Sequence, residues 1–131
     1  MIVLDTNVLV RYLVRDDEQQ AESARALLES LTTERPGYAC REVVVELVWV
    51  LERAYGVSRE RIATILRDLV ATRGLVVEAA DDVARAALRY RAGGPGFSDL
   101  MVLAAAERSG ARPLYTFDRK AARLDGVQLL R

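Results

Sequence analysis

The sequence contains no histidine and only one cysteine in 131 residues. The absence of histidine excludes a Ser-His-Asp triad, a Cys-His pair, an imidazole base and a histidine-ligated zinc. The single cysteine, Cys40, excludes an internal disulfide and a zinc site built from several cysteines. Any catalysis must therefore use carboxylates, hydroxyls, arginine or a bound metal. Oxygen ligands of this kind favour Mg²⁺ or Mn²⁺ over zinc or copper.

The sequence also lacks long apolar runs, an excess of either charge and the common nucleotide-binding motifs. No apolar run reaches the ~18 residues that a transmembrane helix needs. The start of the chain has no basic region of the kind found in signal peptides, so we expect a cytoplasmic protein without a membrane partner. The net charge is zero, so the chain has no overall excess of basic residues of the kind that favours nucleic-acid binding. The length and the 51% hydrophobic content fit a single globular domain over residues 1–131.

Short apolar segments alternate along the chain with segments of helical periodicity. Strands are expected near residues 2–4, 38–40, 75–78, 114–117 and 127–130, and helices near 8–13, 18–31, 42–55, 59–72, 82–91 and 99–109, with a short basic helix after 118. This alternation predicts an α/β fold with a central, mostly parallel sheet of about four or five short strands and helices on both faces. Asp81 and Asp82 are expected to serve only as N-terminal charges of their helix.

Three aspartates lie at junctions where ligands bind in parallel α/β sheets. Asp5 and Asp118 each end an apolar strand just before a helix, and Asp99 opens a helix after a glycine-rich loop. Asp5 could simply cap its helix, but Thr6 or Asn7 could do so without it. A helix-start acid such as Asp99 is also common without any chemical role. Because these junctions are expected at the same edge of the sheet, we nevertheless favour a role in a functional site for these acids.

Glu46 is the one charged residue within an otherwise apolar run, Val43–Leu51. A run of this kind predicts a buried element, in which a carboxylate is costly unless it is paired, protonated or bound to a cation. Two interpretations follow, an ion pair with Arg53 within the helix or a metal ligand facing a shared acidic site. If all four acids meet at one sheet edge, a divalent cation relieves their repulsion and polarises a phosphate.

Four stretches together resemble the PIN-domain ribonucleases and, within them, the VapC-type toxins of bacterial toxin–antitoxin pairs. They are Ile2–Leu9, the helix Glu42–Tyr55 with Glu46 in the acidic position, Phe97–Asp99 and Thr116–Lys120. The resemblance implies that Asp5 and Asp99 are the main metal ligands, that Glu46 and Asp118 complete the catalytic acids, and that Asn7 and Thr116 support them.

The same resemblance implies an endoribonuclease that depends on Mg²⁺ or Mn²⁺. It would hydrolyse RNA phosphodiester bonds and leave a 5′-phosphate and a 3′-hydroxyl, which fits the absence of histidine. It also implies a homodimer and a cognate antitoxin whose C-terminal segment crosses the acidic groove. An antitoxin arginine would pair there with the carboxylates.

Other functions remain open at this point. An RNA-processing PIN nuclease without an antitoxin would use the same acids, and a PIN-like module could bind RNA or a partner without cutting. A haloacid-dehalogenase-like phosphatase also places an aspartate after its first strand, but it needs a second one where this chain has Asn7.

Overall fold

The computed structural model describes residues 1–131 and consists of six α-helices, one short 3₁₀ helix and five short strands. In chain order these are β1 (Ile2–Val3), α1 (Thr6–Leu13), α2 (Glu18–Glu29), β2 (Gly37–Ala39), α3 (Arg41–Arg53), α4 (Arg59–Ala71), β3 (Leu75–Val77), α5 (Ala80–Arg91), α6 (Phe97–Ser109), β4 (Leu114–Thr116), η1 (Ala121–Arg123) and β5 (Val127–Leu129). The alternation of strands and helices and the parallel pairing confirm the α/β class.

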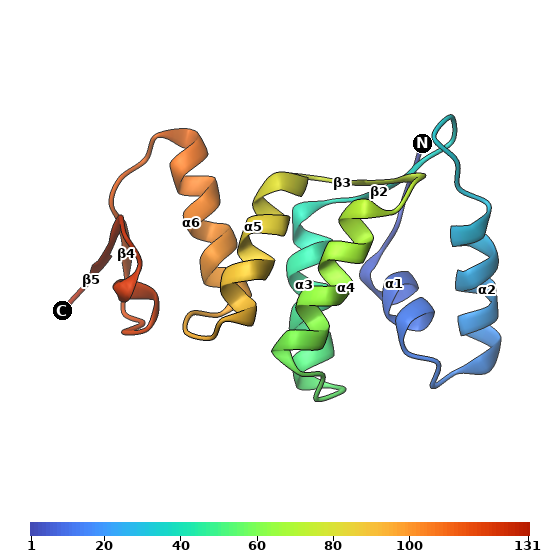
Figure 1. The fold of residues 1–131 in the computed structure, drawn as a ribbon, viewed down its shortest axis with the longest axis horizontal. Helices are drawn as coiled ribbons and strands as arrows, with labels where there is room; N and C mark the ends of the chain where they lie inside the picture. The colour runs from blue at the N-terminus through green and yellow to red at the C-terminus, as the bar shows by residue number, and fades with distance from the viewer.

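The five strands form two parallel sheets, whereas the sequence predicted one central sheet. β1, β2 and β3 pair in that order, with Ile2 level with Gly37 and Gly37 level with Leu75. β4 and β5 pair separately, with Leu114 level with Val127. In Figure 1 this second sheet lies beyond α6, at the opposite end of the molecule from α1 and α2. Strands of two or three residues form few ladder hydrogen bonds, so helix packing decides where they lie.

A single cluster of 24 buried residues, contributed mainly by α1 and by α3 to α6, forms the core, and Leu28 of α2 packs against it. It extends from Leu4 at the end of β1 to Leu124 beside β5. Tyr90 of α5 and Phe97 of α6 meet edge to face, with ring centroids 6.0 Å apart. None of the helices combines the length and apolar character needed to cross a membrane.

Asp82 is a buried ion-pair centre, which corrects the expectation that it is only a helix-start charge. Its side chain is 4% exposed, and it accepts hydrogen bonds from Arg108 of α6 at 2.5 Å and from Arg85 at 2.9 Å. The bond from Arg108, opposed by burial and reinforced by Arg85, lowers the pKa of the Asp82 carboxyl. Arg41 of α3 lies 3.6 Å from the same carboxylate and donates to the Met101 carbonyl of α6 at 2.7 Å. These contacts fasten α6 to α5 and α3.

Candidate functional site

Asp5 and Glu46 are linked through Thr6, which lies between them. Asp5 is the N-cap of α1, and its Oδ1 accepts a hydrogen bond from the Thr6 amide at 2.7 Å. The buried Thr6 hydroxyl donates to Glu46 Oε1 at 2.5 Å. The junction between β1 and α1 therefore places Asp5 near Glu46, which follows 41 positions later in the chain. Asp5 itself caps the helix, although Thr6 or Asn7 could have done so, and its Oδ2 forms no hydrogen bond.

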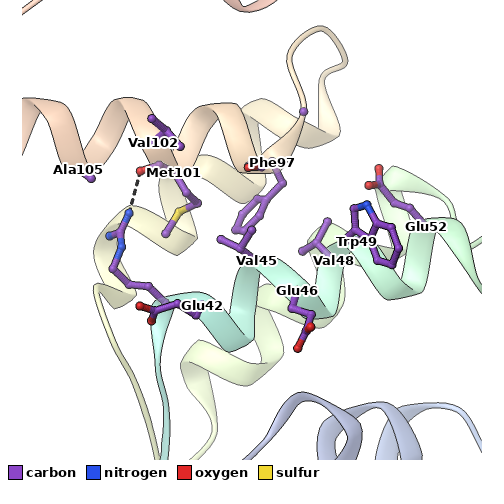
Figure 2. A pocket seen from close by; sticks show the side chains of 13 residues that line it. Glu42, Val45, Glu46, Val48, Trp49, Glu52, Phe97, Met101, Val102 and Ala105 are labelled. Atoms are coloured by element: carbon purple, nitrogen blue, oxygen red, sulfur yellow. Dashed lines mark hydrogen bonds between the residues drawn. The ribbon is translucent and has the colours of Figure 1, made fainter. Parts of the chain in front are cut away.

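Glu46 is exposed, which corrects the prediction that it lies inside a buried helix. Its helix buries Val43, Val44, Leu47, Val48 and Leu51 on one side, while the other side borders open cavities. Glu46 forms no ion pair with Arg53, whose guanidinium lies 5.7 Å from the Trp49 ring centre. In Figure 2 the Glu46 carboxylate points away from Val45 and Phe97, which face the groove between α3 and α6.

The side-chain oxygens around Asp5 and Glu46 are suitable ligands for a hard divalent cation. Asp5, Asn7 and Glu46 line one cavity of about 500 Å³ and offer only oxygen ligands through carboxylates and a side-chain amide. Neither carboxylate forms a salt bridge. Two carboxylates that form no ion pair in one cavity are chemically suited to Mg²⁺ or Mn²⁺. We call Asp5, Asn7 and Glu46 the N-terminal half-site.

Asp99, Thr116 and Asp118 form a second group around the start of α6 and the end of β4, which we call the C-terminal half-site. Asp99, in the first turn of α6, and Thr116 of β4 line a cavity of about 130 Å³. Asp118 is exposed, and its Oδ1 accepts hydrogen bonds from the amides of Lys120 and Ala121 at 2.8 and 2.9 Å. The Thr116 hydroxyl accepts one from the Asp118 amide at 3.0 Å.

The two half-sites are separate in this structure. No three acidic, histidine or cysteine side chains lie close enough together to hold a metal ion. A metal at the N-terminal half-site would therefore meet two protein carboxylates, fewer than the four that the sequence suggested. The separation follows from the sheets, because β4 with its following Asp118 pairs with β5 and not with β1.

The glycine-rich loop before Asp99 is held in place by Arg59, a residue that the sequence did not single out. Its guanidinium donates to the carbonyls of Tyr90, Gly94 and Pro95 at 3.0 to 3.1 Å. The same group lies 4.5 Å from the Tyr90 ring centre. Arg59 thereby fixes the segment that starts α6 and positions Asp99.

Arg11 and Tyr55 are two further residues at the N-terminal half-site that sequence reasoning missed. Both line the cavity of Asp5 and Glu46, and Arg11 is its only cationic residue. Arg11 donates through Nη1 to Asp16 and to the Tyr55 hydroxyl, at 3.1 and 3.2 Å. Its Nη2 forms no hydrogen bond to the protein. Arg11 lies one helical turn after Asn7, which is the one signal in the sequence that could have indicated it.

Comparison with protein families gives a match to the PIN domain over residues 2–127. The chain belongs to the PIN-domain family. PIN domains are typically metal-dependent nucleases that act on RNA, so membership supports nuclease activity in general. A search of the curated proteins finds no relative that matches the chain.

Proposed function

We propose that this PIN domain is an endoribonuclease that depends on Mg²⁺ or Mn²⁺ and acts in the cytoplasm as the toxin of a toxin–antitoxin pair. The observation that supports the activity most strongly is the pairing of Asp5 and Glu46 through Thr6 in one cavity. Asp5, Glu46, Asp99 and Asp118 are the proposed catalytic and metal-binding acids. Asn7 and Thr116 are the proposed supporting residues.

The residues of the N-terminal half-site suit the hydrolysis of a phosphodiester. A bound divalent cation supplies charge neutralisation at the phosphate and a more acidic water. Asp5 and Glu46 would hold the ion, and Thr6 keeps Glu46 turned toward Asp5. Arg11 offers the two N–H groups of its free Nη2 to a phosphate oxygen in the same cavity.

The toxin role is supported by the acidic groove between α3 and α6 (Figure 2). This groove has a volume of about 650 Å³, with Val45, Trp49 and Met101 among its apolar residues. Glu42 and Glu52 of α3 also line it. Apolar side chains interleaved with arginine on an antitoxin segment would match this combination.

A cleavage assay on the purified chain tests the activity. Structured RNA should be cut with Mg²⁺ or Mn²⁺, and the cutting should stop in EDTA and in Asp5→Asn. The matched control is Asp68→Asn, because Asp68 is an exposed acid of α4 whose side chain makes no hydrogen bond or ion pair. RNA that is bound but left intact by the wild type would instead establish a binding module.

The toxin role needs its own experiment. Induced expression should arrest growth, and co-expression of a small protein encoded next to this gene should relieve the arrest and co-purify with the chain. An RNA-processing nuclease would cut RNA in the first assay but would neither arrest growth nor bind such a protein.

A further inference from the structure

A cavity of about 730 Å³ lies between α1 and α2, beside the N-terminal half-site, and we call it the α1–α2 cleft. Its volume is within the range of small-molecule binding sites, which is about 300–1,000 Å³. Asn7 and Arg11 line both this cleft and the cavity that contains Asp5 and Glu46. An RNA strand with one phosphate at the half-site can therefore place the neighbouring nucleotide in the cleft.

Arg11 is held at the boundary between the two cavities. Its Nε donates to Gln20 Oε1 at 2.6 Å, and its Nη1 donates to Asp16 and to the Tyr55 hydroxyl at 3.1 and 3.2 Å. These three bonds fix the plane of the guanidinium and leave the two N–H groups of Nη2 unpaired. Because a guanidinium matches phosphate oxygens, Arg11 can bind the phosphate that links a nucleotide at the half-site to one in the cleft.

The α1–α2 cleft combines apolar surface with uncharged hydrogen-bonding side chains. Ala24 is 6% exposed, and Leu27, which is 37% exposed, follows three positions later on the same side of α2. Asn7, Gln19 and Ser23 contribute two amides and a hydroxyl, and none of these three side chains forms a hydrogen bond within the chain. Gln19 and Ser23 are four positions apart on α2, so their side chains are neighbours. The cleft therefore offers free donors and acceptors beside an apolar surface.

The lining of the cleft carries no net charge. Asp17 is its only acid and Arg11 its only basic residue. Asp17 caps α2, and its Oδ1 accepts a hydrogen bond from the Gln20 amide at 2.9 Å. A neutral lining of amides and a hydroxyl suits an uncharged polar ring better than a phosphate or an arginine side chain. The groove between α3 and α6, with its glutamates and apolar residues, suits a basic protein segment instead.

We propose that the α1–α2 cleft binds one unpaired nucleobase of the RNA, next to the scissile phosphate, and selects it through Gln19, an inference that rests on the proposed function. A side-chain amide presents a donor and an acceptor side by side, which allows a paired hydrogen bond to the edge of a base. Ser23 would add a second contact, and the face of the base would lie against Leu27. Arg11 would hold the phosphate and the cleft would read the base, which divides positioning from selection.

Binding of short RNA tests the cleft without reference to cleavage. Fluorescent hexamers of A, C, G or U are titrated with the full chain in EDTA, in a lithium buffer that keeps the G hexamer single-stranded. The wild type should bind one hexamer at least about 10-fold more tightly than the weakest. Gln19→Ala, which keeps a good helix former, should bring the four affinities close together. Gln128→Ala, at an exposed glutamine of β5, is the matched control and should keep the preference. Equal binding of all four by the wild type, or a preference that Gln19→Ala leaves unchanged, would overturn the proposal.

Mapping of the cut sites tests the same selection during cleavage. With Mg²⁺, the wild type and Gln128→Ala should enrich one base at one position beside the cut. Gln19→Ala should lose this enrichment and cut the favoured sites about 10-fold more slowly, and Ser23→Ala should weaken it. Unchanged cut sites in Gln19→Ala, with loss of a co-purifying protein, would assign the cleft to a protein ligand and overturn the proposal. Base-selective binding by a wild type that cuts no RNA would count against the proposed function alone, whereas cutting without any base preference would overturn the cleft alone.

Discussion

The Thr6 hydroxyl donates a hydrogen bond to Glu46 Oε1 at 2.5 Å and thereby joins the start of α1 to the middle of α3. Thr6 is 5% exposed, whereas the carboxylate that it holds is open to solvent. A buried donor of this kind fixes one oxygen of Glu46 and leaves the other for a ligand. Thr6 is therefore a positioning residue between the two acids.

Thr6→Val should reduce cleavage about 10–100-fold, the range seen when partners of metal ligands are removed. The two side chains are similar in shape, and water can replace the lost donor at Glu46, so the free energy of unfolding should change by less than about 1 kcal/mol. Thr6→Ser keeps the hydroxyl and should restore most of the activity. Equal losses in Thr6→Val and Thr6→Ser would show that the methyl packing matters and the hydrogen bond does not.

Glu46→Gln should be a folded, inactive protein. Because Glu46 is exposed and has no cationic partner, its neutralisation should change the free energy of unfolding by no more than about 0.5 kcal/mol. Glu42→Gln, one turn earlier on the same helix and also exposed, is the matched control and should retain activity. Urea melts and RNA cleavage measure the two effects. An unstable Glu46→Gln protein with normal cleavage per folded molecule would show that Glu46 stabilises the fold and does not take part in cleavage.

Added Mn²⁺ or Mg²⁺ should raise the melting temperature of the wild type, because an ion that binds only the folded state stabilises it by mass action. At a concentration of about 100 times Kd the gain is about 2.7 kcal/mol. The gain should disappear in the Asp5→Asn/Asp99→Asn double variant and persist in Asp68→Asn. A melting temperature that metal leaves unchanged in the wild type would refute the metal site.

Local signals in the sequence predicted much of the fold. Asp17 and Ser58 cap α2 and α4 through their side chains, and Gly110 ends α6 in a left-handed conformation at φ 74°. Asp5 stands at the predicted handover from strand to helix. These features depend on neighbouring residues, which a sequence displays directly.

Features that depend on distant partners were not predictable from the sequence. Asp82 has the same local context as any acid near a helix start, and only the arrival of Arg108 from α6 makes it a buried ion pair. Glu46 was expected to be buried because its neighbours are apolar, but Trp49 on the same side of the helix is 56% exposed. The strand pattern of Leu114–Thr116 likewise does not specify whether β1 or β5 is its partner.

Asp82→Asn should destabilise the chain by about 1–3 kcal/mol at pH 7, because it weakens charged hydrogen bonds to arginine. The pKa of Asp82 is lower in the folded protein than in the unfolded chain. Its contribution is therefore fully present above the unfolded pKa of about 4 and is lost as the pH falls through the folded value. Urea melts at pH 7 and pH 3 should show the gap between wild type and variant narrowing at pH 3.

The neighbouring exposed acid provides the control for this pH effect, since Asp81→Asn should change stability little at either pH. A difference between wild type and Asp82→Asn that is equally large at both pH values would show that the ionised carboxylate is not what fastens α6.

The central claim, hydrolysis by a metal-bound carboxylate site without histidine, is tested most directly by the chemistry of the RNA ends. RNA cut by the wild type with Mg²⁺ or Mn²⁺ is treated with a 5′-phosphate-dependent exonuclease and, separately, with a ligase that requires a 3′-hydroxyl. We expect 5′-phosphate and 3′-hydroxyl ends, because attack by water leaves the 2′-hydroxyl uninvolved. Products with a 2′,3′-cyclic phosphate and a 5′-hydroxyl, formed equally well in EDTA, would contradict the account.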